Sequence, residues 1–292
     1  MAVPPEGQGL PGDTASRSNF MKSKISNALL ALVFLIGLAL LLYPGLSDWW
    51  NSFRQSEVIA NYTQTVSALD EEANETLWNQ AQQYNQELNQ RQNGFSLSEA
   101  MRQTYESLLN PGGDGVMGYV EIPCIGVNLP IYHGTDDAEL QAGVGHLEWT
   151  SLPVGGQGTH CALSGHRGLP SAKLLSNLDK VQEGDLFVLH ILGEKLTYQV
   201  DQIRIVEPND VSCLAVEDGR DLCTLITCTP YGVNTQRLLV RGLRIENQAD
   251  GQGGRITADA VQLEPLQVAS LAVVPLLLVL LVALLLHARK KK

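Results

Sequence analysis

The chain has 292 residues, an apolar share of 44% and a formal net charge of -11 at pH 7. This composition is typical of one globular domain of ordinary size with extensions, and it excludes collagen-like and largely disordered proteins. The acidic balance argues against nucleic acid as a partner, because binding to a phosphate backbone depends on clustered Lys and Arg.

The N-terminal part of the chain is predicted to anchor the protein in a membrane. Residues 1–24 are predicted to be a cytoplasmic tail, of which residues 1–20 are rich in Gly, Pro and Ser, lack hydrophobic periodicity and are expected to be disordered. Residues 25–43 form a nearly continuous apolar run behind Lys22 and Lys24, which is long enough to cross a bilayer as a helix. A cleaved signal peptide is the alternative, but the run exceeds a usual signal core and no Ala-x-Ala pattern follows it.

A second apolar run predicts a second membrane span. Residues 268–286 carry no charge and are followed by a basic tail, residues 287–292. By the positive-inside rule both basic flanks lie in the cytoplasm, so the chain between the spans lies outside the cell. A cleaved cell-wall sorting tail would need a preceding Leu-Pro-x-Thr-Gly motif, which does not stand before this run. We therefore predict a two-pass membrane protein with both termini cytoplasmic.

The extracytoplasmic residues 44–112 are predicted to be mainly helical. Apolar residues recur there at helical spacing in a stretch rich in Gln, Asn and Glu, which predicts one or two amphipathic helices. The pattern breaks at Asn93, Gly94 and Phe95 and restarts on a short helix from Ser98. The break predicts a loop.

Residues 113–248 change to a strand-like pattern. Gly, Pro, Asn and Asp separate most of the short apolar or alternating runs, as in a closed or sandwiched sheet. The expected strands are Met117–Ile122, Asn128–Tyr132, His160–Ser164, Leu186–Ile191, Lys195–Ile205, Leu222–Cys228 and Arg237–Glu246. Only Ala138–Gly143 and Ser171–Asn177 look helical. The predicted fold class is mainly β, a closed and mainly antiparallel β-barrel with short helices, which residues 249–267 link to the second span.

The segment Cys223–Gly242 predicts a nucleophile and a fixed cation on one hairpin. A strand ends at Cys228, turn-forming residues follow, and a second strand brings back Arg237. The thiol and the guanidinium are therefore expected to face each other across one loop. A cysteine becomes reactive when positive charge or a base favours its thiolate.

Six histidines are candidates for the base, and His166 is preferred. It follows an apolar strand among small residues, a position that suits an exposed catalytic group. His146 is the main competitor. The remaining candidates are His133, His160, His190 and His287.

The five cysteines form no CxxC pair, so a structural zinc site is not expected and no cofactor is predicted. Cys161 and Cys223 each precede a candidate catalytic residue by five positions. The two thiols approach each other only if their strands are parallel neighbours, and buried reduced thiols are the preferred interpretation over a disulfide.

The candidate residues have distinct expected roles. His166 would protonate a leaving amine and later accept a proton from an incoming one. Arg237 is a poor base because a guanidinium keeps its proton, so it would hold the substrate backbone or stabilise an oxyanion. The alternative is a surface ion pair for Arg237, and Arg241 is expected to be only structural.

Four segments carry a family resemblance: GDGVMGYVEIP at Gly113–Pro123, GVGHLEWTSLPVGG at Gly143–Gly156, LSGHRGLPSAKL at Leu163–Leu174 and TLITCTPYGVNTQRLLVRG at Thr224–Gly242. They resemble the sortases, the cysteine transpeptidases of Gram-positive bacterial surfaces, and fit the class C, pilus-assembling branch best. The resemblance implies a sortase β-barrel, cleavage of a Leu-Pro-x-Thr-Gly-like signal between Thr and Gly, and acyl transfer to a lysine of a pilin subunit. It places the family's histidine, cysteine and arginine on His166, Cys228 and Arg237.

The chain departs from the class in the region of the lid. The class usually carries an Asp-Pro-aromatic lid that plugs the active site, and the nearest equivalent is Asn93, Gly94 and Phe95, without the acidic group. Gln236 stands where the class often has His. Three alternative functions remain: a sortase that anchors surface proteins to the cell wall, a hydrolytic membrane-anchored cysteine protease, and a membrane-held scaffold in which Cys228 is structural.

Overall fold

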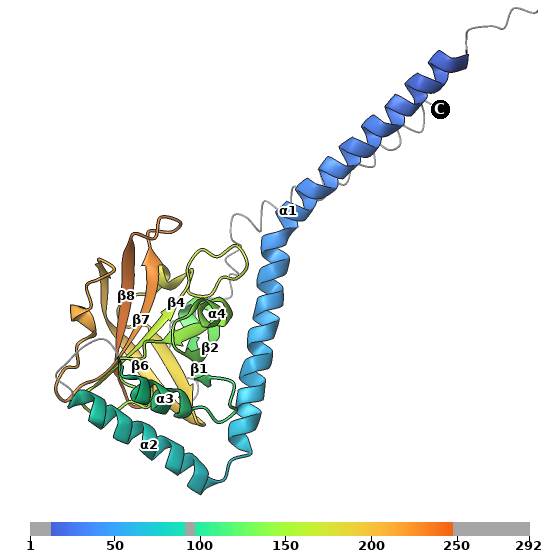
Figure 1. Cartoon of the computed structure of the whole chain (residues 1–292). Coiled ribbons are helices and arrows are strands. Elements are labelled where there is room, and N and C mark those ends of the chain that lie inside the picture. The colour runs from blue at the N-terminus through green and yellow to red at the C-terminus, as the bar shows by residue number, and fades with distance from the viewer. Residues whose placement is uncertain (1–12, 91–96, 248–292) are drawn as a thin grey trace, which may run out of the picture. The chain divides into compact units, whose positions relative to one another are not determined.

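The computed structural model describes residues 13–90 and 97–247 (Figure 1). The second predicted span, its linker and basic tail, His287 and the lid residues Asn93, Gly94 and Phe95 lie outside the described residues. Contacts divide the chain into two compact units, one of which begins at Ser47 and contains the barrel.

Helix α1 spans Asp13–Ser67 and includes Pro44. Its segment Ala31–Ser67 is the one helix among the described residues that is long and apolar enough to cross a membrane. The disorder predicted for residues 1–20 is wrong from Asp13 onward, because the helix already begins there. No Gly or Pro stands between Asp13 and residue 36, so nothing in this stretch opposes helix formation.

Two shorter helices follow and confirm the amphipathic patterns. Helix α2, Glu71–Asn89, starts at Asp70, whose Oδ1 accepts a hydrogen bond from the Ala73 amide at 2.8 Å. Helix α3, Glu99–Ser107, buries Met101 and Tyr105. Both helices add their apolar faces to the main core, together with the end of α1.

Eight strands close into a barrel in the order β1-β2-β3-β4-β7-β8-β6-β5 (Figure 1). Their bounds are Val116–Ile122 (β1), Val127–His133 (β2), Val144–His146 (β3), Thr159–Gly165 (β4), Leu186–Ile191 (β5), Glu194–Val206 (β6), Asp221–Thr229 (β7) and Gln236–Arg244 (β8). All neighbours are antiparallel except β2 with β3 and β4 with β7. The mainly β barrel is therefore confirmed, and the three-residue β3 is the strand that the pattern missed.

The short helical elements confirm one expectation and overturn another. Helix α4, Asp137–Ala142, forms where a helix was predicted, and 3-10 turns occur at Pro123–Ile125 (η1), Leu178–Lys180 (η2) and Ser212–Leu214 (η3). The helix expected at Ser171–Asn177 is absent from this described segment. Leu174 has a φ of 41°, which interrupts a right-handed helix, and the Leu175 amide donates to the His166 carbonyl.

The parallel pairing of β4 with β7 decides where the reactive groups lie. Register partners run from Thr159 with Asp221 to Ser164 with Ile226. Both strands therefore end at the same edge of the barrel, since parallel strands share a direction. β8 returns antiparallel beside β7, so three strand ends meet there.

Candidate active site

The hairpin of β7 and β8 pairs Cys228 directly with Arg237. Along β7, Cys223 and Leu225 belong to the main core, and side chains alternate between the two faces of a strand. Cys228 therefore shares the outer face with Ile226 and Thr224. The thiol is half-buried, and the guanidinium is also partly accessible. The predicted meeting of a thiol and a cation across one loop is thus present in the strand register.

His166 stands at the same end of the barrel because it follows directly after β4. The last register partners of β4 and β7 are Ser164 and Ile226, two residues before His166 and Cys228 respectively. Thr227 extends this register, since its buried Oγ1 donates to the Gly165 carbonyl at 2.8 Å. The sequence pattern did not single out Thr227, although it locks the two strand ends together.

Arg237 has hydrogen-bonding capacity left for a ligand. Its Nη1 donates to the backbone carbonyls of Asn234 at 3.3 Å and Gln236 at 3.1 Å. Within residues 13–90 and 97–247 it forms no ion pair, so the alternative of a surface ion pair is not supported there. Gln236, which replaces a common histidine, donates instead to Glu207 at 3.0 Å.

A small apolar cluster lies on the outer face next to Cys228. Its buried members are Ala162, Leu214, Ile226 and Leu239, and the partly buried Leu147, Trp149, Val206 and Cys213 pack against it. Ile226 is two positions before Cys228 and pairs with Leu239 on β8. The cluster therefore packs the outer face of the sheet two positions before the thiol on β7.

Two other histidines that were candidates for the base, His146 and His160, are held inside the protein by hydrogen bonds. His146 is fully buried, and its ring nitrogens lie 3.0 Å from the Tyr105 hydroxyl and 2.9 Å from the Ser151 carbonyl. His160 lies between the Ala215 carbonyl and Thr224 Oγ1, each at 2.8 Å. Neither ring is presented to a substrate, because both are within the packed structure.

The other two described histidines also have partners. His133 contacts the carbonyls of Leu108 and Gly115, and burial lowers its pKa. The His190 ring is stacked 4.2 Å from Tyr119 and lies 3.2 Å from Glu121 Oε2. His166 is therefore the described histidine that stands at the end of the barrel with Cys228.

All five cysteines are free thiols. Cys161 and Cys223 are register partners on parallel strands, so the condition for their approach is met. Both are buried, and burial raises the pKa of the Cys223 thiol well above its ordinary value. This environment agrees with the predicted reduced, packed thiols.

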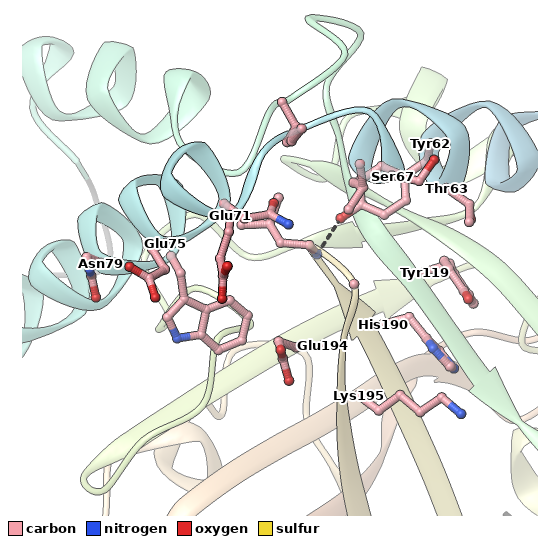
Figure 2. Close-up of a pocket in the computed structure, with 16 residues that line it drawn as sticks. Tyr62, Thr63, Ser67, Glu71, Glu75, Asn79, Tyr119, His190, Glu194 and Lys195 are labelled. Carbon is pink, nitrogen blue, oxygen red and sulfur yellow. Dashed lines mark hydrogen bonds between the residues drawn. The ribbon is translucent and has the colours of Figure 1, made fainter.

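A cavity of about 1030 Å³ lies away from the predicted catalytic residues, between the helices α1 and α2 and the barrel strands (Figure 2). Figure 2 shows Glu71 and Glu75 on the helical side, and His190 and Lys195 on the strand side. None of His166, Cys228 and Arg237 lines this cavity, so size alone does not locate the reactive groups. In the described ranges no group of three or more His, Cys, Asp or Glu side chains is arranged to hold a metal ion.

The site so defined is suited to acyl transfer: a half-buried thiol, an imidazole and a guanidinium at one end of a closed barrel. The chain matches the family model for the sortase domain over residues 120–245. Sortase C1 of Streptococcus agalactiae is 47% identical with a TM-score of 0.64, over 66% of this chain and 100% of that chain. Sortase C of Clostridium perfringens, solved with the C-terminal cell wall sorting motif, is 40% identical with a TM-score of 0.58, over 66% of this chain and 100% of that chain.

Curated relatives are similar in sequence to this chain over a shorter segment. Sortase D of Bacillus subtilis is 30% identical over 131 residues, which are 44% of this chain and 63% of the relative. The matched segment thus spans less than two thirds of that relative. Given 47% identity across the whole of a solved sortase C1, the chain belongs to the sortase family, whose members are cysteine transpeptidases. Several solved structures to which it is similar are class C sortases.

Proposed function

We propose that this protein is a membrane-anchored transpeptidase that joins pilin subunits through thioester chemistry on Cys228. The observation that carries the proposal is the strand register: β7 pairs Cys228 with Arg237, and the parallel strand β4 delivers His166 to the same barrel end. The class C neighbours support the pilin substrate, since one of them is described in terms of pilin substrate specificity.

The first step of the proposed reaction opens the sorting signal. Cys228 Sγ attacks the threonine carbonyl of a Leu-Pro-x-Thr-Gly-like segment, and the Thr–Gly bond breaks. His166 gives a proton to the departing glycine amine. Arg237 holds the substrate backbone or the developing oxyanion with its remaining donors, where a fixed positive charge stabilises the transition state.

The second step transfers the acyl group. A pilin lysine amine attacks the thioester carbonyl, an isopeptide bond forms, and the carbon–sulfur bond breaks. His166 accepts the proton that the amine loses, and Cys228 returns to its starting state. Free acid instead of isopeptide would form if water replaced the amine.

The membrane arrangement is part of the proposal. Helix α1 supplies a span of sufficient length and hydropathy, and the second span at residues 268–286 would place both termini in the cytoplasm with the barrel outside. A full-length chain expressed with a reporter at either terminus should show cytoplasmic reporter activity at both ends. An extracytoplasmic C-terminus would refute the two-pass arrangement.

The decisive experiment uses the full-length chain in detergent with a sorting-signal peptide and a lysine-bearing pilin. An isopeptide-linked product, identified by mass spectrometry, is the expected result. Free acid alone would favour a hydrolytic protease, transfer only to cell-wall peptide amines would favour a wall-anchoring sortase, and no cleavage at all would favour a scaffold.

A further inference from the structure

A buried arginine next to His166 links the two loops that carry the proposed reaction. Arg167 lies in the loop after β4, and its side chain is only 7% exposed. Its Nη2 forms an ion pair of 2.5 Å with Asp179 Oδ2, in the η2 turn. The arginine thereby fixes its own loop to the turn that follows it in the chain.

The same guanidinium also reaches the loop after β7. Its Nη1 lies 3.3 Å from Thr229 Oγ1, one residue after Cys228. Its Cζ stands 5.7 Å from the centre of the Tyr231 ring, a cation–π distance. Arg167 therefore contacts the chain on both sides of the proposed reaction centre, one residue from His166 and one from Cys228.

The backbone confirms that the two loops touch. Gly168 has a φ of 77°, and a Cβ placed there would lie 3.2 Å from the Tyr231 ring. The Gly168 amide is held by Ser176 Oγ at 3.0 Å. The Tyr231 ring thus rests against the glycine that follows Arg167, and the contact leaves little room for relative movement.

Stability alone does not explain an arginine at this position. Its Nε is buried and has no hydrogen-bond partner among the residues that the structure describes. Burying a cation with an unpaired donor is unfavourable, and an apolar side chain often stabilises such a site as well or better. What an apolar residue cannot supply is a rigid planar fork that binds a carboxylate, a hydroxyl and a ring at once.

We propose that Arg167 is a positioning residue that sets the placement of His166 relative to Cys228 by joining their loops. The inference rests on the proposed function for the roles of these two residues. An error of about 1 Å between reacting groups can cost about 100-fold in rate. Loss of the bridge should therefore slow the chemical steps with little effect on binding of the sorting peptide, which Arg167 is not proposed to contact.

The test compares Arg167→Gln and Arg167→Lys with a matched control, Arg244→Gln, in the full-length chain. Arg244 also stands over a tyrosine ring, 5.8 Å from that of Tyr198, but at the other end of β8. We expect Arg167→Gln to lower kcat by about 10- to 100-fold with little change in KM. Arg167→Lys, which keeps the charge and loses the fork, should recover only part of the rate, and Arg244→Gln should leave kcat unchanged.

A second readout needs no turnover. The rate of Cys228 alkylation by iodoacetamide is measured against pH for the wild type, Arg167→Gln and His166→Ala. The profile of Arg167→Gln should move toward that of His166→Ala, whereas Arg244→Gln should follow the wild type. If Arg167→Gln does not fold, Asp179→Asn alters only the 47% exposed partner and should shift the profile in the same direction by less.

The outcomes separate the inference from the function on which it rests. Wild-type kcat and alkylation profile in Arg167→Gln would overturn the positioning role, and so would full recovery by Arg167→Lys, since charge alone would then suffice. A shifted alkylation profile in a protein that forms no isopeptide product would support the positioning role and reject the proposed function. Identical profiles for the wild type and His166→Ala would reject both.

Discussion

Two arginines on one strand show how differently the two ends of this sheet are built. Arg237 and Arg241 are four residues apart on β8, so both side chains face the outer side of the barrel. Arg241 is 11% exposed and donates to Asp201 through Nε at 3.0 Å and Nη2 at 2.8 Å, and to Glu217 through Nη1 at 2.7 Å. Among the residues that the structure describes, Arg237 donates from Nη1 alone, to two backbone carbonyls of its own turn.

The two ends of β8 therefore differ in how many of their polar groups have partners. We call the end around Arg241 the closed end and the end around Arg237 the reactive end. Around Arg241, the carboxylates of Asp201 and Glu217 pair with Arg241 and Arg220, and the nearby His160 ring is hydrogen-bonded to the Ala215 carbonyl and Thr224 Oγ1. Around Arg237, the thiol and two guanidinium nitrogens have no comparable partners among the described residues. An arginine with all three guanidinium nitrogens engaged by carboxylates is expected to be structural, and one with two unengaged nitrogens has donors left for a substrate.

The largest expected effect tests the reactive end itself. Cys228→Ala should lower transpeptidation by more than about 10⁴-fold, because the thioester cannot form. His166→Ala should lower it by about 10²- to 10⁴-fold, because proton transfer to and from the amines is lost. Isopeptide formation measured by mass spectrometry checks both, and retained turnover in Cys228→Ala would refute the mechanism.

The next effect addresses the two arginines directly. Arg237→Gln should lower kcat/KM by about 10²- to 10³-fold through the loss of a charge-stabilising donor, with a change of about 0.5 kcal/mol or less in unfolding free energy. Arg241→Gln should cost about 1 kcal/mol of stability, since Asp201 and Glu217 lose one of the two arginines that pair with them while Arg220 remains. Its activity should remain close to that of the wild type.

Denaturant unfolding and kinetics on both variants check this contrast. A large loss of activity in Arg241→Gln at full stability would mean that the closed end also takes part in catalysis.

A smaller effect concerns acid stability at the closed end. Burial lowers the pKa of His160, although its hydrogen bond to the Ala215 carbonyl opposes this, and Arg241 adds to the lowering while Glu217 and Asp201 oppose it. In the unfolded chain His160 therefore becomes protonated near pH 6.5, whereas in the folded chain it stays neutral until the pH is lower. The stability from neutral His160 is full above about pH 6.5 and is lost as the pH falls through the lower folded pKa.

Thermal unfolding of His160→Gln between pH 7 and pH 5 should therefore show a shallower decline than the wild type. Asp201 is not expected to contribute in this window. Burial opposes its ionisation, but hydrogen bonds from Arg241 hold its pKa below the usual value, so its window lies lower. An unchanged slope in His160→Gln would show that another buried group, such as His133, controls acid stability.

The smallest effect concerns the predicted lid over the reactive end. Deletion of Asn93, Gly94 and Phe95 should raise kcat/KM by less than about tenfold. This means that the free energy by which the closed lid is favoured over the open one is less than about 1.4 kcal/mol. Asn93→Asp, which restores an acidic group, should lower kcat/KM by strengthening closure over Arg237. Unchanged rates in both variants would mean that this segment is no lid.

Local patterns were enough to locate most of the barrel and the hairpin that carries Cys228 and Arg237. Alternation of apolar residues marks a strand whatever lies beside it, and turn residues mark where it ends. The pattern failed at Ser171–Asn177, where helix-compatible residues are held irregularly by contacts with distant chain. The Ser171 carbonyl accepts from Asn51 Nδ2, and the Lys173 amide donates to Asp48 Oδ1, both at 2.8 Å.

The sequence by itself determined the chemistry: a thiol and a guanidinium separated by one turn, an exposed histidine after a strand, and an apolar helix able to anchor the chain. Only the tertiary structure decided that β4 runs parallel beside β7, which brings His166 to Cys228 across more than sixty residues and assigns His146 and His160 to the interior. The tertiary structure also places Arg167 between the loops after β4 and β7. It pairs all three guanidinium nitrogens of Arg241 with carboxylates, whereas among the described residues Arg237 is hydrogen-bonded through Nη1 alone. Long-range pairing of strands leaves no signal in local periodicity, because the periodicity of a strand reports which face is buried and not which strand lies beside it.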